Sequence, residues 1–200
     1  MQPLGEAFSF QSLDEVHGFF VSMSPLEVRE QMADFGSLWQ LHPDEYPEIF
    51  LHGRTVKIPR WQQAFGEDYH FSGQVSRGLP IPSELEPVWR WACETIDSRL
   101  NGLLLNWYDA RLGHYIGKHR DSTTHMIEQA PIVTVSLGEE RTFRLRPYGG
   151  RGFYDVPMPD GTVIVVPYDT NLVWTHEVPK STRAKDRRIS ITLRAFESST

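Results

Sequence analysis

Three residues in the second half of the sequence are of the types that bind a divalent transition metal. His119 and Asp121 are two positions apart, so in a strand their side chains would point to the same face. Such a short pair also arises by chance. A second histidine downstream gives it weight, because His176 follows a later strand-like run and ends the turn-bounded stretch Asp169–His176. Two imidazoles and one carboxylate leave coordination positions open, as a non-haem Fe(II) oxygenase requires. We therefore expect these three residues to share a metal.

The C-terminal run from Arg188 to Arg194 supplies a second chemical signal. Its residues alternate between an apolar layer (Ile189, Ile191, Leu193) and a polar face (Arg188, Ser190, Thr192, Arg194). Arginines that point into a β-barrel are costly unless an anion meets them, and a dicarboxylic acid suits the bidentate guanidinium. The alternative is an exposed edge strand with solvated arginines, and the metal motif favours the inward orientation.

Short strands and two helices are expected to position these residues. Strand-like runs bounded by turn residues cover 103–108, 132–137, 142–146, 162–166 and 188–196. Ser24-Pro25-Leu26-Glu27 predicts a helix start and Gly36 its end, with Val28, Met32 and Phe35 facing inward. A second helix is predicted from Pro87 to Leu100, with Cys93 in the core. The fold class is therefore mainly β with supporting helices (α+β), a sandwich or jelly roll.

Length and composition restrict the class of protein. The 200 residues are 40% hydrophobic and contain one cysteine, which excludes a disulfide scaffold and a cysteine-based zinc site. No apolar run approaches the roughly 18 residues of a membrane span, and the N-terminus lacks a signal-peptide pattern. We expect a monomer in the cytoplasm, or in the nucleus of a eukaryote, with no membrane partner and no obligate protein partner. One domain is predicted over 1–200, with an acidic helical cover (1–50), a lid segment and supporting helix (50–100) and a jelly-roll core (101–197).

An ordered set of motifs then resembles the AlkB-like Fe(II)- and 2-oxoglutarate-dependent dioxygenases. The set comprises Asn106-x-Tyr108, His119-x-Asp121, Pro131-Ile132 leading to Ser136-Leu137-Gly138, His176, and Arg188-x-Ser190-x-Thr192-x-Arg194. Upstream, Ile58-Pro59-Arg60-x-Gln62, Gly66 and Tyr69-His70-Phe71-Ser72-Gly73 resemble the substrate lid of the branch that repairs alkylated nucleic acid. The resemblance covers about residues 50–196.

The resemblance implies a double-stranded β-helix, which is a jelly roll, and a complete set of site residues. Fe(II) would be held by the catalytic ligands His119, Asp121 and His176. Arg188 would pair with the distal carboxylate of 2-oxoglutarate, helped by Tyr108 and Ser190, while Asn106 and Arg194 would act at the cosubstrate's other end. O₂ completes the reactants.

The resemblance also implies a substrate, namely bases such as 1-methyladenine and 3-methylcytosine in DNA or RNA. Their oxidative demethylation releases formaldehyde, succinate and CO₂. Tyr69 and Phe71 are candidate walls that stack on the base, and Arg60 is a candidate polar contact of the lid. Alternatively, Tyr69 and Phe71 alternate as core and surface residues of an ordinary strand.

Two departures from the repair branch affect the substrate. A predicted hairpin around His52-Gly53-Arg54 carries Leu51-His52 where duplex-repair proteins have a bulky apolar wedge, so single strands are expected over duplexes. Ser122-Thr123-Thr124 replaces an acidic pair that contacts the base in close repair homologues. An alternative function is the same oxygenase chemistry on a small metabolite, lipid or protein side chain. A third is a jelly-roll module that binds a metal or anion without turnover.

The net charge of −6 is unevenly distributed. Residues 1–50 carry nine acidic residues and one basic residue, a balance of −8, which leaves +2 for residues 51–200. Phosphate binding draws on lysine and arginine, and several of these follow the lid, the metal motif and His176. The overall acidity therefore does not exclude a nucleic-acid substrate.

Overall fold

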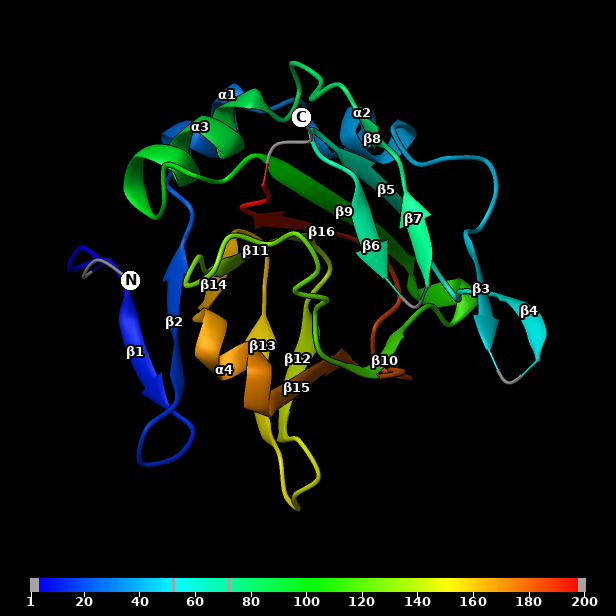
Figure 1. Cartoon of the computed structure of the whole chain (residues 1–200). Coiled ribbons are helices and arrows are strands. Elements are labelled where there is room, and N and C mark those ends of the chain that lie inside the picture. The colour runs from blue at the N-terminus through cyan, green and yellow to red at the C-terminus, as the bar shows by residue number, and fades with distance from the viewer. Residues whose placement is uncertain (1–3, 52, 72, 198–200) are drawn as a thin grey trace.

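The protein is described by a computed structural model that covers residues 4–51, 53–71 and 73–197. Two β-sheets face each other, and helices cover the outer side of the larger sheet (Figure 1). None of the described helices is long and apolar enough to cross a membrane.

The larger sheet contains eight strands and the smaller sheet four. The larger has the order β1 (Ser9–Ser12), β2 (Gly18–Met23), β14 (Thr162–Val166), β11 (Ile132–Gly138), β16 (Arg187–Arg194), β9 (Gly102–Asp109), β5 (Trp61–Phe65) and β8 (Gly78–Leu79). The smaller has the order β10 (Ile116–His119), β15 (Trp174–Val178), β12 (Arg141–Pro147) and β13 (Tyr154–Met158). Every pairing is antiparallel except that of β5 with β8.

Two hairpins and five helical segments complete the described chain. The hairpins are β3 (Glu48–Leu51) with β4 (Arg54–Lys57), and β6 (Tyr69–Phe71) with β7 (Gln74–Ser76). The helices are α1 (Leu26–Gln31), α2 (Phe35–Gln40), α3 (Glu86–Thr95), α4 (Tyr168–Val173) and the 3-10 turn η1 (Ala110–Leu112). The predicted hairpin near Gly53 therefore forms, and Gly53 has a φ of 79°. The proposed wedge position His52, like Ser72 of the lid motif, lies outside the described residues.

Strand alternation creates one apolar layer on each side of the larger sheet. On β16, Ile189, Ile191 and Leu193 are fully buried in the layer that α2 and α3 cover. The opposite face of the central strands meets the smaller sheet, where residues such as Phe143 and Ile164 form a second core. The four polar residues of β16 line a cavity between the sheets. The expected inward orientation of Arg188 and Arg194 is thus confirmed.

The predicted fold class, mainly β with a jelly-roll core and supporting helices, is confirmed, and each of the five strand-like runs contains a strand. Sequence periodicity missed β10, β13 and β15. The short strand Tyr154–Met158 contains Pro157 and is exposed at three of its five residues, so it lacks the continuous apolar pattern of a central strand. His176 belongs to β15 rather than to a turn.

The N-terminal segment differs from the expected helical cover. Its first elements are β1 and β2, and β2 pairs with β14 at the edge of the larger sheet. Phe19 on β2 is fully buried in the core between the sheets. That residues 1–200 form one domain, with the predicted internal boundaries, stays a prediction.

Both predicted helices are shorter than expected. Ser24 does not cap α1, because its hydroxyl donates to the Gly161 carbonyl at 3.0 Å. The helix ends at Gln31, and Gly36 lies within α2, whose cap is Asp34. Met32 is buried as predicted, whereas Phe35 is half-buried. The helix α3 ends at Thr95 instead of Leu100, and Cys93 packs half-buried against the core.

Candidate active site

A cavity of about 470 Å³ between the two sheets brings together every site residue predicted from the sequence. Its lining includes the expected metal ligands (His119, Asp121, His176), the expected cosubstrate residues (Asn106, Tyr108, Arg188, Ser190, Arg194) and the expected substrate residues (Arg60, Tyr69, Phe71). Residues from the N-terminal and C-terminal halves of the chain therefore share one cavity.

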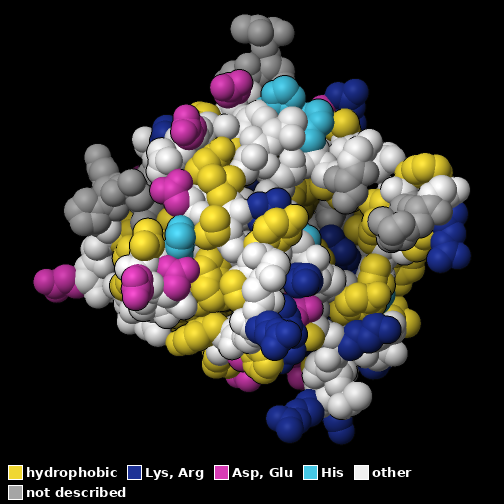
Figure 2. Space-filling model, turned by 60° about the horizontal axis from the view of Figure 1, so that its bottom comes forward, with side chains coloured by type: hydrophobic (Ala, Val, Ile, Leu, Met, Phe, Trp, Pro, Cys, Tyr) yellow, Lys and Arg dark blue, Asp and Glu magenta, His cyan; other side chains and the backbone are white. Residues whose placement is uncertain are grey.

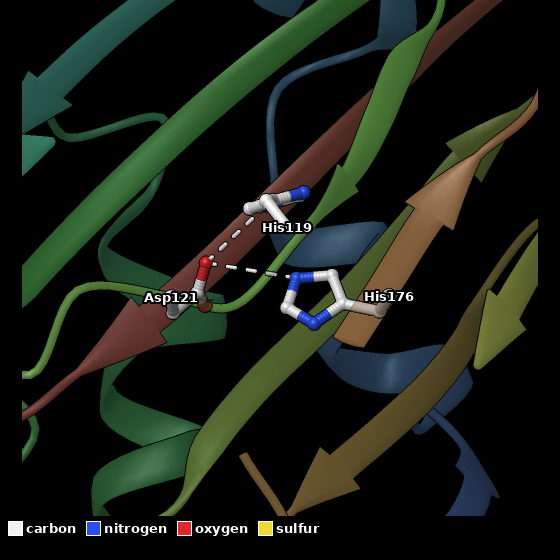
Figure 3. A group of neighbouring side chains, drawn as sticks. All are labelled: His119, Asp121 and His176. Carbon is white, nitrogen blue, oxygen red and sulfur yellow. Dashed lines mark ion pairs between the residues drawn. The ribbon is translucent and has the colours of Figure 1, made fainter. Parts of the chain in front are cut away.

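The three candidate metal ligands converge at one end of β10. His119 is the last residue of β10 and lies opposite His176 on β15, while Asp121 follows two residues beyond the strand. One ligand atom from each residue lies within 4.8 Å of the others. Asp121 Oδ1 is 3.5 Å from His119 Nε2 and 3.6 Å from His176 Nε2 (Figure 3). The prediction that His119 and Asp121 share a strand face is wrong, because β10 has already ended before Asp121.

Neighbouring groups orient each ligand. His119 Nδ1 donates to the Gly117 carbonyl at 2.8 Å, which leaves Nε2 free to bind a metal. The ring of Phe143 stacks on His176 with centroids 5.2 Å apart. The Asn171 side chain binds the backbone of Asp121 twice, accepting from its N–H at 3.0 Å and donating to its C=O at 3.1 Å.

The local charges favour the metal-binding protonation states. Burial raises the pKa of Asp121, but Arg194, His176 and His119 outweigh this and hold the pKa well below its usual value. Arg194 donates to Asp121 Oδ2 through Nη2 at 2.7 Å and Nε at 3.1 Å. Burial, together with His176, lowers the pKa of His119. A carboxylate and a neutral imidazole are the forms that bind Fe(II), so the triad fits a metal.

The surroundings of Arg188 show whether the cavity suits a carboxylate cosubstrate. Its side chain is only 1% exposed, and Nε donates to Ser136 Oγ at 2.8 Å. Nη1 and Nη2 are buried without a hydrogen-bond partner among the described residues. Burial lowers the pKa of Arg188 to about 10, so the group remains cationic at neutral pH. Unpaired parallel donors on a buried cation suit a carboxylate, so the arrangement fits one end of 2-oxoglutarate.

The other expected cosubstrate residues are engaged with protein groups. Arg194 binds Asp121, and Asn106 Oδ1 accepts from Arg60 Nε at 2.7 Å. Tyr108 lies beneath Arg188, whose Cζ is 5.2 Å from the ring centroid. Arg60, expected as a lid contact, is buried and also donates to Gln62 Oε1 at 3.0 Å. The roles of these residues in binding stay predictions.

Tyr69 and Phe71 lie side by side on one wall of the cavity. Both belong to β6, and their rings stack at 5.6 Å with an interplanar angle of 14°. The Tyr69 hydroxyl donates to Asp121 Oδ1 at 3.4 Å. The alternative that these residues alternate between core and surface is wrong, because positions i and i+2 of a strand share a face. Their contact with a substrate stays a prediction.

Several residues of the site carry no signal in the sequence. Asn171 and Phe143 act on metal ligands that are distant in sequence, and Gln62 appeared only as part of a family motif. Outside the described lining of the cavity, His114 is buried, and its Nδ1 accepts from the Asp109 N–H at 3.1 Å while its Nε2 lies 3.0 Å from the Tyr46 hydroxyl. Long-range contacts of this kind become visible only in the folded chain.

Comparisons with known proteins are consistent with this geometry. Residues 30–194 match the family model described as the 2OG-Fe(II) oxygenase superfamily. The chain is 28% identical over 158 residues to "DNA oxidative demethylase ALKBH2" of Mus musculus, covering 74% of this chain and 66% of that protein. It is 28% identical over 157 residues to "Alpha-ketoglutarate-dependent dioxygenase alkB homolog 3" of Rattus norvegicus, covering 70% and 51%.

A solved structure shows the same fold. The structure of OsALKBH1 matches with a TM-score of 0.59 at 13% identity and covers 94% of this chain and 100% of that chain. The chain spans only about half to two thirds of the length of the two curated relatives.

Proposed function

The chain belongs to the 2OG-Fe(II) oxygenase superfamily and is AlkB-like within it, and we propose that it oxidatively demethylates N-alkylated bases in nucleic acid. The expected lesions are of the 1-methyladenine and 3-methylcytosine type, in DNA or RNA. The observation that carries the proposal is that the two unpaired nitrogens of Arg188 belong to the cavity that also holds the His119, Asp121 and His176 triad.

Each half of the site has a separate task in this proposal. His119, Asp121 and His176 would hold Fe(II), and Arg188 would hold the distal carboxylate of 2-oxoglutarate, with Tyr108 and Ser190 beside it. When bound, Fe(II), 2-oxoglutarate and O₂ supply the oxidation that yields succinate and CO₂ and hydroxylates the N-methyl carbon, after which formaldehyde leaves. The protein's own task is to place the methyl group and to exclude water.

The position of the methyl group requires an unpaired base. A methyl group on the Watson–Crick edge cannot be reached within a duplex, so the base must be single-stranded or flipped out. The stacked Tyr69 and Phe71 rings support a role as one wall against such a base. Lys118 and Arg120 are exposed at the same cavity, and Figure 2 shows Lys and Arg gathered on the lower right of one face. We propose single-stranded nucleic acid as the preferred partner.

An assay with methylated oligonucleotides tests the proposal. The protein is incubated with Fe(II), 2-oxoglutarate, ascorbate and single strands that contain 1-methyladenine or 3-methylcytosine. We expect formaldehyde release, restoration of the unmodified base and loss of both activities in His119→Ala. Succinate formation without base repair would support the alternative of a metabolite, lipid or protein substrate. Absence of any 2-oxoglutarate turnover would favour a non-catalytic binding module.

A further inference from the structure

Gln62 presents an unused hydrogen-bond donor in the cavity. The side chain is 3% exposed, and its Nε2 has no hydrogen-bond partner among the described residues. Arg60 Nη2 donates to Gln62 Oε1 at 3.0 Å. Because a guanidinium can only donate, this contact assigns the amide oxygen to the Arg60 side and leaves Nε2 as the free donor. A buried donor without a partner is costly, so a ligand group that accepts from it would be favoured.

The position of Gln62 separates it from the predicted cosubstrate residues. In the larger sheet, Gln62 on β5 lies opposite Asn106 on β9, and Asn106 lies opposite Ser190 on β16. Two strand spacings place β5 roughly 10 Å from β16, which carries Arg188. Arg60 also bridges Asn106 and Gln62. The free donor therefore belongs to the part of the cavity away from Arg188, where the substrate base is expected.

Cationic side chains, which only donate hydrogen bonds, outnumber carboxylates in the described lining of the cavity. Asp121 is the one carboxylate in the described lining. Both of its oxygens are already engaged, Oδ2 by Arg194 and Oδ1 by the Tyr69 hydroxyl at 3.4 Å. The lining also contains Arg60, Lys118 and Arg120, which are donors only. A base that presents an acceptor beside its methyl group would fit this lining better than one that presents only an amino group.

We propose that Gln62 is a specificity-determining residue that donates through Nε2 to a carbonyl oxygen next to the methylated ring nitrogen. This inference rests on the proposed base demethylation. In 3-methylcytosine and 1-methylguanine a carbonyl flanks the methylated nitrogen. In 1-methyladenine that nitrogen is flanked by a C–H and an amino group. Gln62 therefore favours the two carbonyl-bearing bases over 1-methyladenine.

The test compares kcat/KM for single strands that each contain one of these three bases. In Gln62→Leu, which removes the donor, we expect the ratios of 3-methylcytosine and of 1-methylguanine to 1-methyladenine to fall about 3- to 10-fold. The kcat/KM for 1-methyladenine should fall less than the other two, because only the contact between Gln62 and Arg60 is lost with that base, and the KM for 2-oxoglutarate should not change. Gln62→Glu keeps an acceptor for Arg60 and replaces the donor with a second acceptor. It should lower both ratios further, which a merely structural defect would not do.

Gln63→Leu is the matched control. Gln63 is the next residue of β5, and its Nε2 donates outside the cavity to the carbonyls of Ala64 and Arg77. The variant Gln63→Leu should leave both ratios of kcat/KM unchanged. Equal losses on all three bases in the Gln62 variants, or a raised KM for 2-oxoglutarate with unchanged ratios, would overturn the inference while leaving the demethylase proposal intact. Absence of demethylation of every base by the unmodified protein would instead overturn the proposed function.

Discussion

Arg188 is a cation whose burial makes sense only together with a ligand. Its guanidinium is almost fully buried, and two of its nitrogens lack a partner among the described residues. Burying such a group costs folding free energy. A bound carboxylate would offset that cost. The hydrogen bond from Arg188 to Ser136 already orients the guanidinium before a carboxylate binds.

Replacing Arg188 should therefore separate binding from stability. In Arg188→Met we expect the KM for 2-oxoglutarate to rise about 30-fold or more, because the bidentate charge pair is lost. Without 2-oxoglutarate, the Tm should stay the same or rise, since an apolar side chain replaces a buried unpaired cation. Steady-state turnover of 2-oxoglutarate measures the KM, and thermal unfolding with and without 2-oxoglutarate measures the Tm and its rise on binding. Arg187→Met, at a half-exposed side chain that packs against Trp39, should keep the ligand-induced rise in Tm.

At the scale of elements, α4 positions a metal ligand that lies beyond the end of a strand. Asp121 has no strand partner, and the two hydrogen bonds from Asn171 replace the missing strand pairing. In Asn171→Ala we expect Fe(II) affinity to fall about 10- to 100-fold, because outer contacts of this kind orient metal ligands. Anaerobic titration with Co(II) in place of Fe(II) measures this affinity. Leu172 is an exposed neighbour in the same helix, so Leu172→Ala should bind the metal as tightly as the unmodified protein does. Equal losses of metal affinity in both variants would contradict the role assigned to Asn171.

The turn between β1 and β2 is tied to the smaller sheet by Asp14. Its carboxylate accepts from the backbone N–H groups of His17 at 2.6 Å and Val16 at 2.8 Å, and from Trp174 Nε1 at 3.0 Å. These contacts, the backbone ones first, lower the pKa of Asp14 well below the usual value of an aspartate, 3.8. A carboxylate with a lowered pKa stabilises the fold above its unfolded pKa, and this contribution is lost as the pH falls below that value.

Removing this carboxylate should lower stability at neutral pH. In Asp14→Ala we expect Tm to fall at pH 7, because the turn loses the hydrogen bonds that this carboxylate accepts. The difference from the unmodified protein should shrink as the pH is lowered below about 3.8. Thermal unfolding across pH measures this, with Glu15→Ala at the exposed neighbouring position as the control. A Tm difference that stays constant down to strongly acidic pH would exclude the carboxylate as its cause.

For the whole molecule, the division of charge bears on the proposed binding of nucleic acid. The first 50 residues carry −8 and the remainder +2, so the net charge of the chain attracts phosphates only weakly at long range. We expect a shallow dependence of single-strand affinity on salt. In Lys118→Gln the slope of log K against log [salt] should fall by about 0.7, the value for one phosphate contact on a single strand. Fluorescence anisotropy across a salt series measures the slope.

Arg99 supplies the control for this prediction. It is paired with Asp97 beyond the end of α3 and does not belong to the described lining of the cavity. Arg99→Gln should therefore leave the slope unchanged. A slope near zero for the unmodified protein would remove nucleic acid as the substrate.

Features that depend on local order and period were predictable from the sequence. Alternation along 188–194 predicted which residues of β16 face the cavity, and the order of short motifs indicated both the jelly roll and the metal triad. The alternation along 188–194 can be read from the sequence, because a strand places i and i+2 on one face regardless of its neighbours.

The fold established the features that depend on contacts between distant segments. It placed β1 and β2 on the sheet edge where an N-terminal helical cover was expected, because the buried Phe19 and the pairing of β2 with β14 outweigh local helix signals. The fold also pairs Arg194 with Asp121, and the contact with Arg60 sets the orientation of the Gln62 amide. Which donors remain free in a buried cavity depends on which partners the fold brings within hydrogen-bonding distance, and periodicity along the chain carries no record of that.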